Sequence, residues 1–204
     1  AAAAAAVISR ERPAAAAITL ETDNPGLPTD SRNLIVRAAY ALRERTGVWA
    51  GAHIHLHKRI PLAAGMAGGS ADAAATLAGL NQLWDLHLSQ PELAEIALTL
   101  GSDVPFCLRG GTVYAAGRGE ILTPLPPLPA WPVLLVTPRF PVATAEVYRR
   151  LDLAGLTPAP AAAVRAVVSQ GTIEALSPYM VNALETVTER DYPVIGALKA
   201  RLRE

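Results

Sequence analysis

The sequence contains little cysteine, few aromatic residues and no excess charge of either sign. Cys107 is the only cysteine among 204 residues, so no disulfide can form within the chain and a zinc cluster is not expected. Val104, Phe106 and Leu108 surround it in sequence, which favours a buried thiol over a nucleophile. Basic and acidic residues balance to a formal net charge of zero, which gives no electrostatic case for nucleic acid or an anionic membrane as a partner.

Long apolar runs are also missing. No run reaches the roughly 18 residues that a membrane helix needs, and the amino end has neither the basic flank nor the apolar region of a signal peptide. The cytoplasm is therefore the expected location. The length suits one large or two small domains with a real hydrophobic core. Alanine blocks at 1–6 and 14–17 are atypical of strands, and no chemistry is inferred from residues 1–17.

Hydrophobic spacing predicts a succession of helices and strands. Asp30 or Ser31 can cap a helix that runs to about Arg45, with Gly47 just past its end. Strict alternation over 52–57 predicts a half-buried strand. Further helices are expected at 70–84, from a capping box at 89–92 to Gly101, at 144–151, at 161–169 and from about 193, with strands at 112–116 and around 133–137.

Two patterns have a plain and a functional interpretation. His53, His55 and His57 share one face of the strand at 52–57 and could in principle hold a metal ion. No carboxylate or fourth ligand lies nearby in sequence, so a solvent-facing row is favoured. The proline-rich segment 123–129 could bind a recognition domain, but a stiff connector between two lobes is the better interpretation.

The segment 61–72 carries the strongest functional signal. Gly65, Gly68 and Gly69 are followed by Ser70 at the predicted start of a helix. Glycine permits left-handed backbone and close approach to the amides, and a helix start presents unpaired N–H groups with partial positive charge. The combination favours a phosphate cradle over a tightly packed turn. No lysine precedes Ser70, so this is not the common P-loop, and a Gly68→Val change is expected to fill space that phosphates need.

Asp103 is the second candidate, in a tight turn just after Gly101. A turn aspartate often bonds to its own backbone, and a general base for phosphoryl transfer is the functional alternative. The turn lies after a predicted helical hairpin that can carry it to the same end of the domain as the loop. This expected proximity to the glycine-rich loop favours the general-base interpretation of Asp103.

These motifs together resemble the GHMP small-molecule kinases. The loop is similar to their Pro-x-x-x-Gly-(Leu/Met)-(Gly/Ala)-(Gly/Ser)-(Gly/Ser)-Ser-(Ser/Ala) phrase, and the resemblance extends over nearly everything from Asn33 onward. The phrases at 101–105 and 117–124 resemble the branch that acts on a cytidine-diphosphate polyol, and set it apart from the mevalonate and homoserine branches. The matching segments are 33–39, 58–84, 98–105, 117–124, 144–148 and 181–185.

The resemblance implies a role for each matching residue. Asp103 would be the catalytic base that contacts the acceptor hydroxyl, and Tyr148 would pack against the cytosine ring. Arg149 and Arg150 are expected to form a solvated face. ATP and Mg²⁺ would be the cofactors, with Ser70 near the metal. The residues implied to bind ATP are Asn33, Leu34, Lys58, Pro61, Leu62, Ala63, Ala64, Gly65, Met66, Ala67, Gly68, Gly69, Ser70 and Ala71.

Three family phrases do not occur in this sequence. They are an opening Pro-Ala-Lys-x-Asn-Leu whose lysine pairs with the catalytic aspartate, a Gly-Tyr-His segment that binds cytidine, and a final glycine-serine motif near the phosphates. We expect the sequence to be incomplete at these points. A protein that truly lacked both ends would be expected to have no useful activity.

The predicted fold is α+β with two lobes. The resemblance implies an amino-terminal ATP-binding lobe at 1–130, similar to domain 2 of ribosomal protein S5, and a ferredoxin-like lobe at 131–204 that is incomplete. The expected activity is transfer of a phosphoryl group from ATP to an alcohol on a small molecule. Two alternatives stay open: a mevalonate- or homoserine-type kinase of the same fold, and an inactive GHMP-fold protein that only binds. Oligomeric state is not predicted.

Overall fold

The computed structural model describes residues 5–9, 16–152, 155–156 and 160–204. It divides into two compact units. The first holds the chain up to Pro61 together with Met66–Pro124, and the second holds Leu62–Gly65 together with Leu125–Glu204. The first alanine block lies mostly outside the described residues, as does part of the second.

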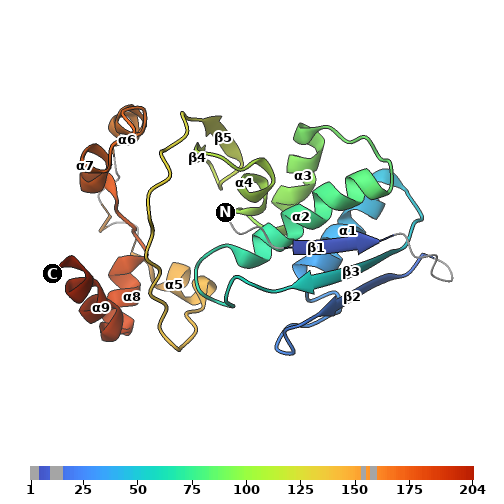
Figure 1. The fold of residues 1–204 in the computed structure, drawn as a ribbon, viewed down its shortest axis with the longest axis horizontal. Coiled ribbons are helices and arrows are strands. Elements are labelled where there is room, and N and C mark those ends of the chain that lie inside the picture. The colour runs from blue at the N-terminus through green and yellow to red at the C-terminus, as the bar shows by residue number, and fades with distance from the viewer. Residues whose placement is uncertain (1–4, 10–15, 153–154, 157–159) are drawn as a thin grey trace. The chain divides into compact units, whose positions relative to one another are not determined.

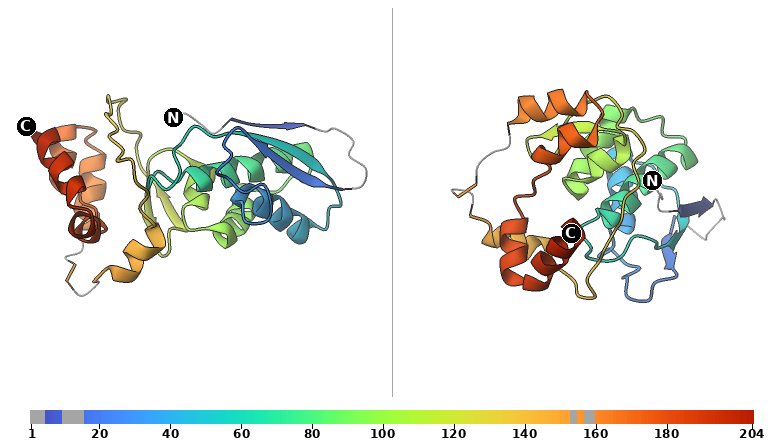
Figure 2. Two further views of the ribbon diagram at one scale, coloured as in Figure 1. Left: turned by 90° about the horizontal axis from the view of Figure 1, so that it is seen from below. Right: turned by 60° about the vertical axis from the view of Figure 1, so that its left-hand side comes forward.

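A three-stranded sheet organises the first unit (Figure 1). Its strands are β1 (Ala5–Ser9), β2 (Ile18–Thr22) and β3 (Ala52–His57), in the order β1-β3-β2. β3 pairs antiparallel with β1 and parallel with β2. The parallel pair needs a crossover, which α1 (Leu34–Thr46) supplies. Helices α1 and α2 (Gly68–Leu83) cover one face of the sheet, as Figure 2 shows.

The strand predicted at 52–57 is confirmed in its bounds and its burial. Ala52, Ile54 and Leu56 are buried, while the three histidines between and after them are only partly covered. The alternation therefore reports which face of β3 meets the helices. The glycine-rich loop begins directly after this strand, at Lys58.

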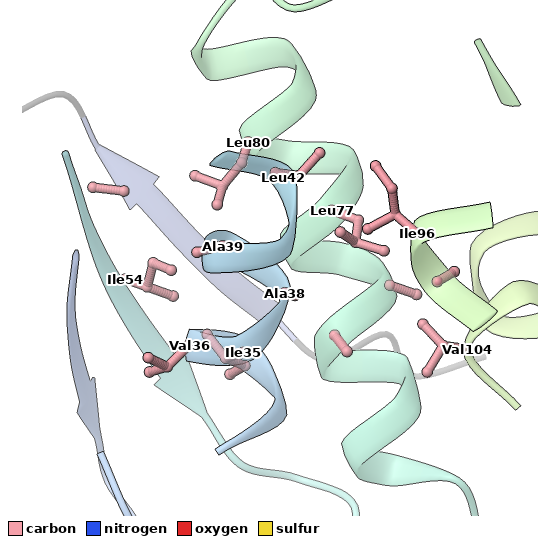
Figure 3. Close-up of a cluster of buried hydrophobic side chains, with 14 of the residues drawn as sticks. Ile35, Val36, Ala38, Ala39, Leu42, Ile54, Leu77, Leu80, Ile96 and Val104 are labelled. Carbon is pink, nitrogen blue, oxygen red and sulfur yellow. The ribbon is translucent and has the colours of Figure 1, made fainter. Parts of the chain in front are cut away.

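The core of the first unit lies between this sheet face and the helices (Figure 3). α1 packs against α2 and β2, α2 also contacts β1, and α3 (Gln90–Leu100) and α4 (Val104–Arg109) pack against α2 and each other. Full burial of a Leu or Ile side chain contributes about 1.5–3 kcal/mol. The labelled core residues are Ile35, Val36, Ala38, Ala39, Leu42, Ile54, Leu77, Leu80, Ile96 and Val104.

Helix ends agree with the sequence in part. Gly47 ends α1 in the left-handed conformation, and the Ser89–Glu92 capping box begins α3, as predicted. The predicted cap of α1 is wrong, because Asn33 accepts the N–H of Ile35 at 3.0 Å and caps the helix. Asp30 instead binds Arg32 side chain to side chain. Because the Asp30 carboxylate is engaged by Arg32, two residues later, it does not cap the helix.

The first unit closes with a hairpin. β4 (Val113–Ala116) corresponds to the predicted strand at 112–116, and β5 (Ile121–Pro124) pairs antiparallel with it. β5 and the short helix α4 were not predicted. β5 includes the first proline of the proline-rich segment, which hid its strand character.

All the regular structure in the described residues of the second unit is helical, and residues 125–143 form none. Its elements are α5 (Thr144–Arg150), α6 (Ala161–Val168), α7 (Ile173–Leu176), the 3₁₀ turn η1 (Ser177–Tyr179), α8 (Glu185–Asp191) and α9 (Pro193–Arg203). The helices predicted near 144, 161 and 193 are confirmed, and α7 and α8 were missed. Across both units, the residues described include no helix of the length and apolarity that would cross a membrane.

The strand predicted around 133–137 is wrong. These residues have no regular structure, and Val133 and Leu134 are 76% and 77% exposed. A strand exists only when another backbone pairs with it, and the described part of the second unit contains no strand. The α+β class nevertheless holds for the molecule, because the sheet and its covering helices form the first unit.

Candidate active site

The amino end of α2 presents unpaired amides. The helix begins at Gly68, two residues before the predicted start at Ser70, and its first internal bond runs from the N–H of Ala71 to the carbonyl of Ala67 at 2.9 Å. The N–H groups of the three residues before Ala71 have no acceptor within the helix. They point out of the helix start together with its partial positive charge. An anion would be held there.

The loop that leads to this helix start is strained. Ala63, Gly65 and Ala67 have φ of 51°, 69° and 49°, which is the left-handed region. For the two alanines this conformation costs roughly 1–2 kcal/mol each. Such backbone persists only where surrounding contacts impose it, and it gathers at ligand-binding turns.

The two glycines at the helix start face different neighbours. A Cβ on Gly68 would lie 2.8 Å from Ile60 Cγ2 and 3.0 Å from Lys58 Nζ, and a Cβ on Gly69 would lie 3.4 Å from Leu34 Cδ1. The expected reason for a bad Gly68→Val change is therefore corrected. The Cβ of the added side chain would already collide with Ile60 and Lys58, which follow β3, before any phosphate is considered.

Lys58 and Asp72 form a buried ion pair. Lys58 Nζ donates to Asp72 Oδ2 at 2.5 Å, and the two side chains are 4% and 6% exposed. The main-chain N–H of Lys58 also donates to Asp23 Oδ1 at 2.9 Å, and this bond is the main reason that the pKa of Asp23 lies below its ordinary value. The main-chain N–H and the ammonium of Lys58 are thus both engaged.

Asp72 was not among the predicted site residues, although the sequence carried a signal for it. Asp72 and Thr76 stand four apart on the face of α2 that also buries Leu80. A carboxylate on a buried helical face needs a partner. Lys58, at the end of the preceding strand, was the available cation.

Asn33 and Leu34 lie at the start of α1. The side chain of Asn33 is buried and engaged at both ends of its amide: its Oδ1 caps α1 and its Nδ2 donates to the carbonyl of Pro28 at 2.8 Å. Leu34 reaches the start of α2, where it lies against Gly69. The structure therefore brings Leu34, Lys58 and the glycines of 68–69 together.

Asp103 stands just before α4 with its side chain exposed. In the described part of the chain its carboxylate accepts no hydrogen bond, either as a helix cap or from its own turn. The backbone-bonded alternative is therefore not realised. The carboxylate is available to a ligand.

The thiol of Cys107 interacts electrostatically with carboxylates of both this turn and α2. Burial, then the carboxylates of Asp103 and Asp72, raise the pKa of its thiol. Both carboxylates therefore act on one half-buried thiol, which agrees with α4 packing against α2. The raised pKa keeps the thiol protonated at neutral pH, so it is not a nucleophile.

A glycine of the β4–β5 turn packs against the Asp103 turn. Gly119 has a φ of +109°, and a Cβ there would lie 2.8 Å from the carbonyl oxygen of Ser102. Only glycine permits both this conformation and this approach. The hairpin thus supports the residue next to Asp103.

Tyr148 belongs to the second unit, on α5, and its side chain is 61% exposed. Its neighbours Arg149 and Arg150 both pair with Glu146, and Arg150 also binds Asp191 at 2.8 Å. These arginines are exposed and engaged, as expected for a solvated face. Leu62–Gly65 of the loop are grouped with this unit as well.

The candidate metal position is a single hydroxyl. Ser70 lies in the first turn of α2, partly covered, and its hydroxyl makes no hydrogen bond to the described part of the chain. Among the residues described, no three His, Cys, Asp or Glu side chains gather in a way that could hold an ion. A cation here would need most of its ligands from a bound phosphate.

The described part of the chain thus combines open amides at the start of α2 with a carboxylate that accepts no hydrogen bond, on the turn before the neighbouring helix α4. Residues 33–111 match the family described as GHMP kinases N terminal domain. A 4-diphosphocytidyl-2-C-methyl-D-erythritol kinase from Pelotomaculum thermopropionicum is 47% identical over 94% of this chain and 67% of its own length. The kinase of that name from Caldicellulosiruptor saccharolyticus is 42% identical over 97% of this chain and 68% of its own.

Solved structures give the same result. A crystal structure of 4-(cytidine 5'-diphospho)-2C-methyl-D-erythritol kinase aligns with a TM-score of 0.68 and 33% identity, over 97% of this chain and 68% of that one. A homoserine kinase from Cytophaga hutchinsonii aligns at 0.65 over 87% of this chain and 61% of that one, with 19% identity, which shows the shared fold alone. The chain belongs to the 4-diphosphocytidyl-2-C-methyl-D-erythritol kinase family, within the ATP-dependent GHMP kinases. It spans about 65% of the length of the first relatives that it matches.

Proposed function

We propose that the protein containing this chain transfers the γ-phosphoryl group of ATP to the 2-hydroxyl of 4-diphosphocytidyl-2-C-methyl-D-erythritol, a step in non-mevalonate isoprenoid synthesis. The observation that carries the proposal is the exposed carboxylate of Asp103, which accepts no hydrogen bond from any described residue and stands at the start of a helix that packs against the one with open amides. The relatives' names supply the acceptor.

Asp103 takes the proton in this mechanism. As the acceptor oxygen forms its bond to the γ-phosphorus, the bond from that phosphorus to the bridging oxygen of ADP breaks, and the hydroxyl proton passes to the Asp103 carboxylate. The open amides at 68–70 hold the phosphates in line for the attack. ADP and the phosphorylated polyol are the products.

The remaining roles follow the loop and its neighbours. We assign Pro61–Ala71 to the phosphates and Leu34, which lies against Gly69, to the edge of the adenine. Asn33 positions Leu34, because its own side chain is consumed in the cap. Lys58 is left with only its main-chain carbonyl to offer the adenine. Tyr148 is assigned to the cytosine ring.

Mg²⁺ fits the donors that are present. It binds hard oxygen ligands and commonly takes few from protein when phosphates supply the others. The unpaired hydroxyl of Ser70 is one such oxygen. When bound, the ion would neutralise phosphate charge, and Ser70 would hold it beside the helix start.

We also propose the finer architecture of two lobes: an amino-terminal lobe at 1–130 like domain 2 of ribosomal protein S5, and part of a ferredoxin-like lobe at 131–204. Three observations support it. The first unit combines a mixed sheet with a covered face, the chain divides within the proline-rich segment, and 133–136 is an exposed apolar run of strand-forming residues.

Replacing Asp103 by Asn tests the catalytic role. The variant should keep ATP binding and lose turnover by roughly 10² or more, the scale for removal of a positioned base. Release of ADP would be followed with the cytidylated methylerythritol on the intact protein. Asp85→Asn, at an exposed loop aspartate, is the matched control and should turn over normally. Near-normal turnover in Asp103→Asn would remove this residue from the mechanism, and no ADP release by wild type would refute the activity.

A further inference from the structure

The Lys58–Asp72 pair joins the two ends of the glycine-rich loop. Lys58 is the first residue after β3, and Asp72 lies just beyond the first turn of α2. Their salt bridge therefore connects the strand end to the helix start and encloses residues 59–71 between them. Both ends belong to the first unit.

The ammonium of Lys58 lies next to Gly68, the first residue of α2. A Cβ on Gly68 would be 3.0 Å from its Nζ, and the side chain is covered to all but 4%. A positive charge at the positive end of a helix is unfavourable by itself. The carboxylate of Asp72 offsets it and leaves the open amides as the source of positive potential.

Among the residues that the structure describes, neither charge has a second partner. The other oxygen of Asp72, Oδ1, is buried without any hydrogen-bond partner, and Lys58 Nζ donates only to Asp72. Each group thus depends wholly on the other, because a buried charge without its partner is strongly unfavourable. The loop ends are held together as long as both are present.

We propose that the Lys58–Asp72 pair is a positioning element for the nucleotide site: it holds both ends of the loop in the binding geometry before ATP arrives, and the ammonium of Lys58 does not touch the nucleotide. The inference rests on the proposed function and reassigns one residue within it. A prearranged loop need not be ordered by the ligand, so the whole population can bind.

Lys58→Met and Asp72→Asn, alone and combined, separate this role from direct contact. Each single variant should raise the Kd for ATP at least ten-fold in the presence of MgCl₂, measured by calorimetry on the intact protein. The double variant should resemble either single one, because all three remove the same link. Lys199→Met, which breaks a partly exposed ion pair with Glu185 and Glu189, is the control and should bind ATP as wild type does.

A second measurement does not depend on ATP. Arg59 is exposed within the loop, next to the pair, and trypsin can cut after it. Both single variants should be cut there several-fold faster than wild type, whereas Lys199→Met should not. If the single variants do not fold, Lys58→Arg and Asp72→Glu keep both charges while shifting the link, and should give smaller changes in the same direction.

Three outcomes would overturn the inference. One is loss of ATP affinity in Lys58→Met but not in Asp72→Asn, which would mean that the ammonium binds the nucleotide. Another is a lower melting temperature in both variants with unchanged Kd, and the third is an unchanged cleavage rate at Arg59. Wild-type protein that fails to bind ATP would instead refute the proposed function.

Discussion

Single residues at this site are constrained by their neighbours. Gly68 is small because Ile60 and Lys58 lie where its Cβ would be, and Gly119 because the carbonyl of Ser102 does. Removing one partner of a buried ion pair such as Lys58–Asp72 costs about 3–5 kcal/mol. A substitution near the loop can therefore lose activity through packing, so each test needs a variant with the same strain elsewhere.

Gly119→Ala should slow turnover by displacing the Asp103 turn. The alanine would have to adopt an unfavourable φ, and its Cβ would lie 2.8 Å from the carbonyl oxygen of Ser102, so that the turn must shift. We expect a loss of roughly ten-fold in kcat, with the KM for ATP unchanged, since a small misplacement of a base is felt in the transition state. Steady-state kinetics and thermal unfolding would measure both effects.

Gly47→Ala is the matched control for this change. Gly47 also has a left-handed φ, of +71°, but no atom lies within 4 Å of its added Cβ. It should lose stability by about 1–2 kcal/mol from strain alone and keep its kcat. Equal kcat in Gly119→Ala and Gly47→Ala would show that the hairpin does not support the Asp103 turn.

At the scale of elements, Asp23 ties the ends of two strands together. It follows β2, and its carboxylate accepts the N–H of Lys58 after β3 and lies 3.3 Å from Nδ1 of His57. The parallel pair β2–β3 is thus fastened where the loop departs. The bond from Lys58 lowers the pKa of Asp23 below the 3.8 expected of the unfolded chain.

Asp23→Asn should change how stability depends on pH. Because the folded pKa is the lower one, the carboxylate stabilises the fold fully above about pH 4 and loses this effect as the pH falls through the folded pKa. The amide cannot titrate, so its unfolding midpoint in urea should fall less steeply below pH 4 than that of wild type. Asp30, with a pKa of about 2, offers a comparison.

The comparison has a definite sign. Asp30→Asn should flatten the curve further down, towards pH 2, because Arg32 holds the Asp30 carboxylate charged to lower pH. A curve for Asp23→Asn that follows wild type throughout would mean that the Asp23 bond contributes nothing to stability.

Elements with a local signal were predictable. The alternation at 52–57 and the capping box at 89–92 each lie within one short segment, and both hold in the structure. The prediction of a strand at 133–137 was wrong, because a strand needs a pairing partner that its own residues do not specify. The site behaves in the same way: the glycines and Asp103 were found as motifs, whereas Asp72 matters through Lys58, fourteen positions earlier.

At the scale of the whole molecule, the proposed reaction needs both units. Asp103, the helix start and the two ends of the phosphate loop lie on the sheet-and-helix unit, whereas Tyr148 lies on the helical one, with which Leu62–Gly65 of the loop are also grouped. ATP affinity and acceptor affinity should therefore be separable by mutation. A change confined to α5 ought to affect the acceptor alone.

Tyr148→Ala tests this separation and the identity of the acceptor. The side chain is 61% exposed, so its removal should not unfold the protein. Loss of one aromatic–base stack, worth roughly 1–3 kcal/mol, should raise the KM for the cytidylated acceptor about ten-fold or more and leave the KM for ATP unchanged. Tyr148→Phe keeps the ring and should stay near wild type, as should Tyr40→Ala, a half-exposed tyrosine on α1. An unchanged acceptor KM in Tyr148→Ala would argue against cytosine stacking and favour a mevalonate- or homoserine-type acceptor, since neither of those carries a base for the ring to hold.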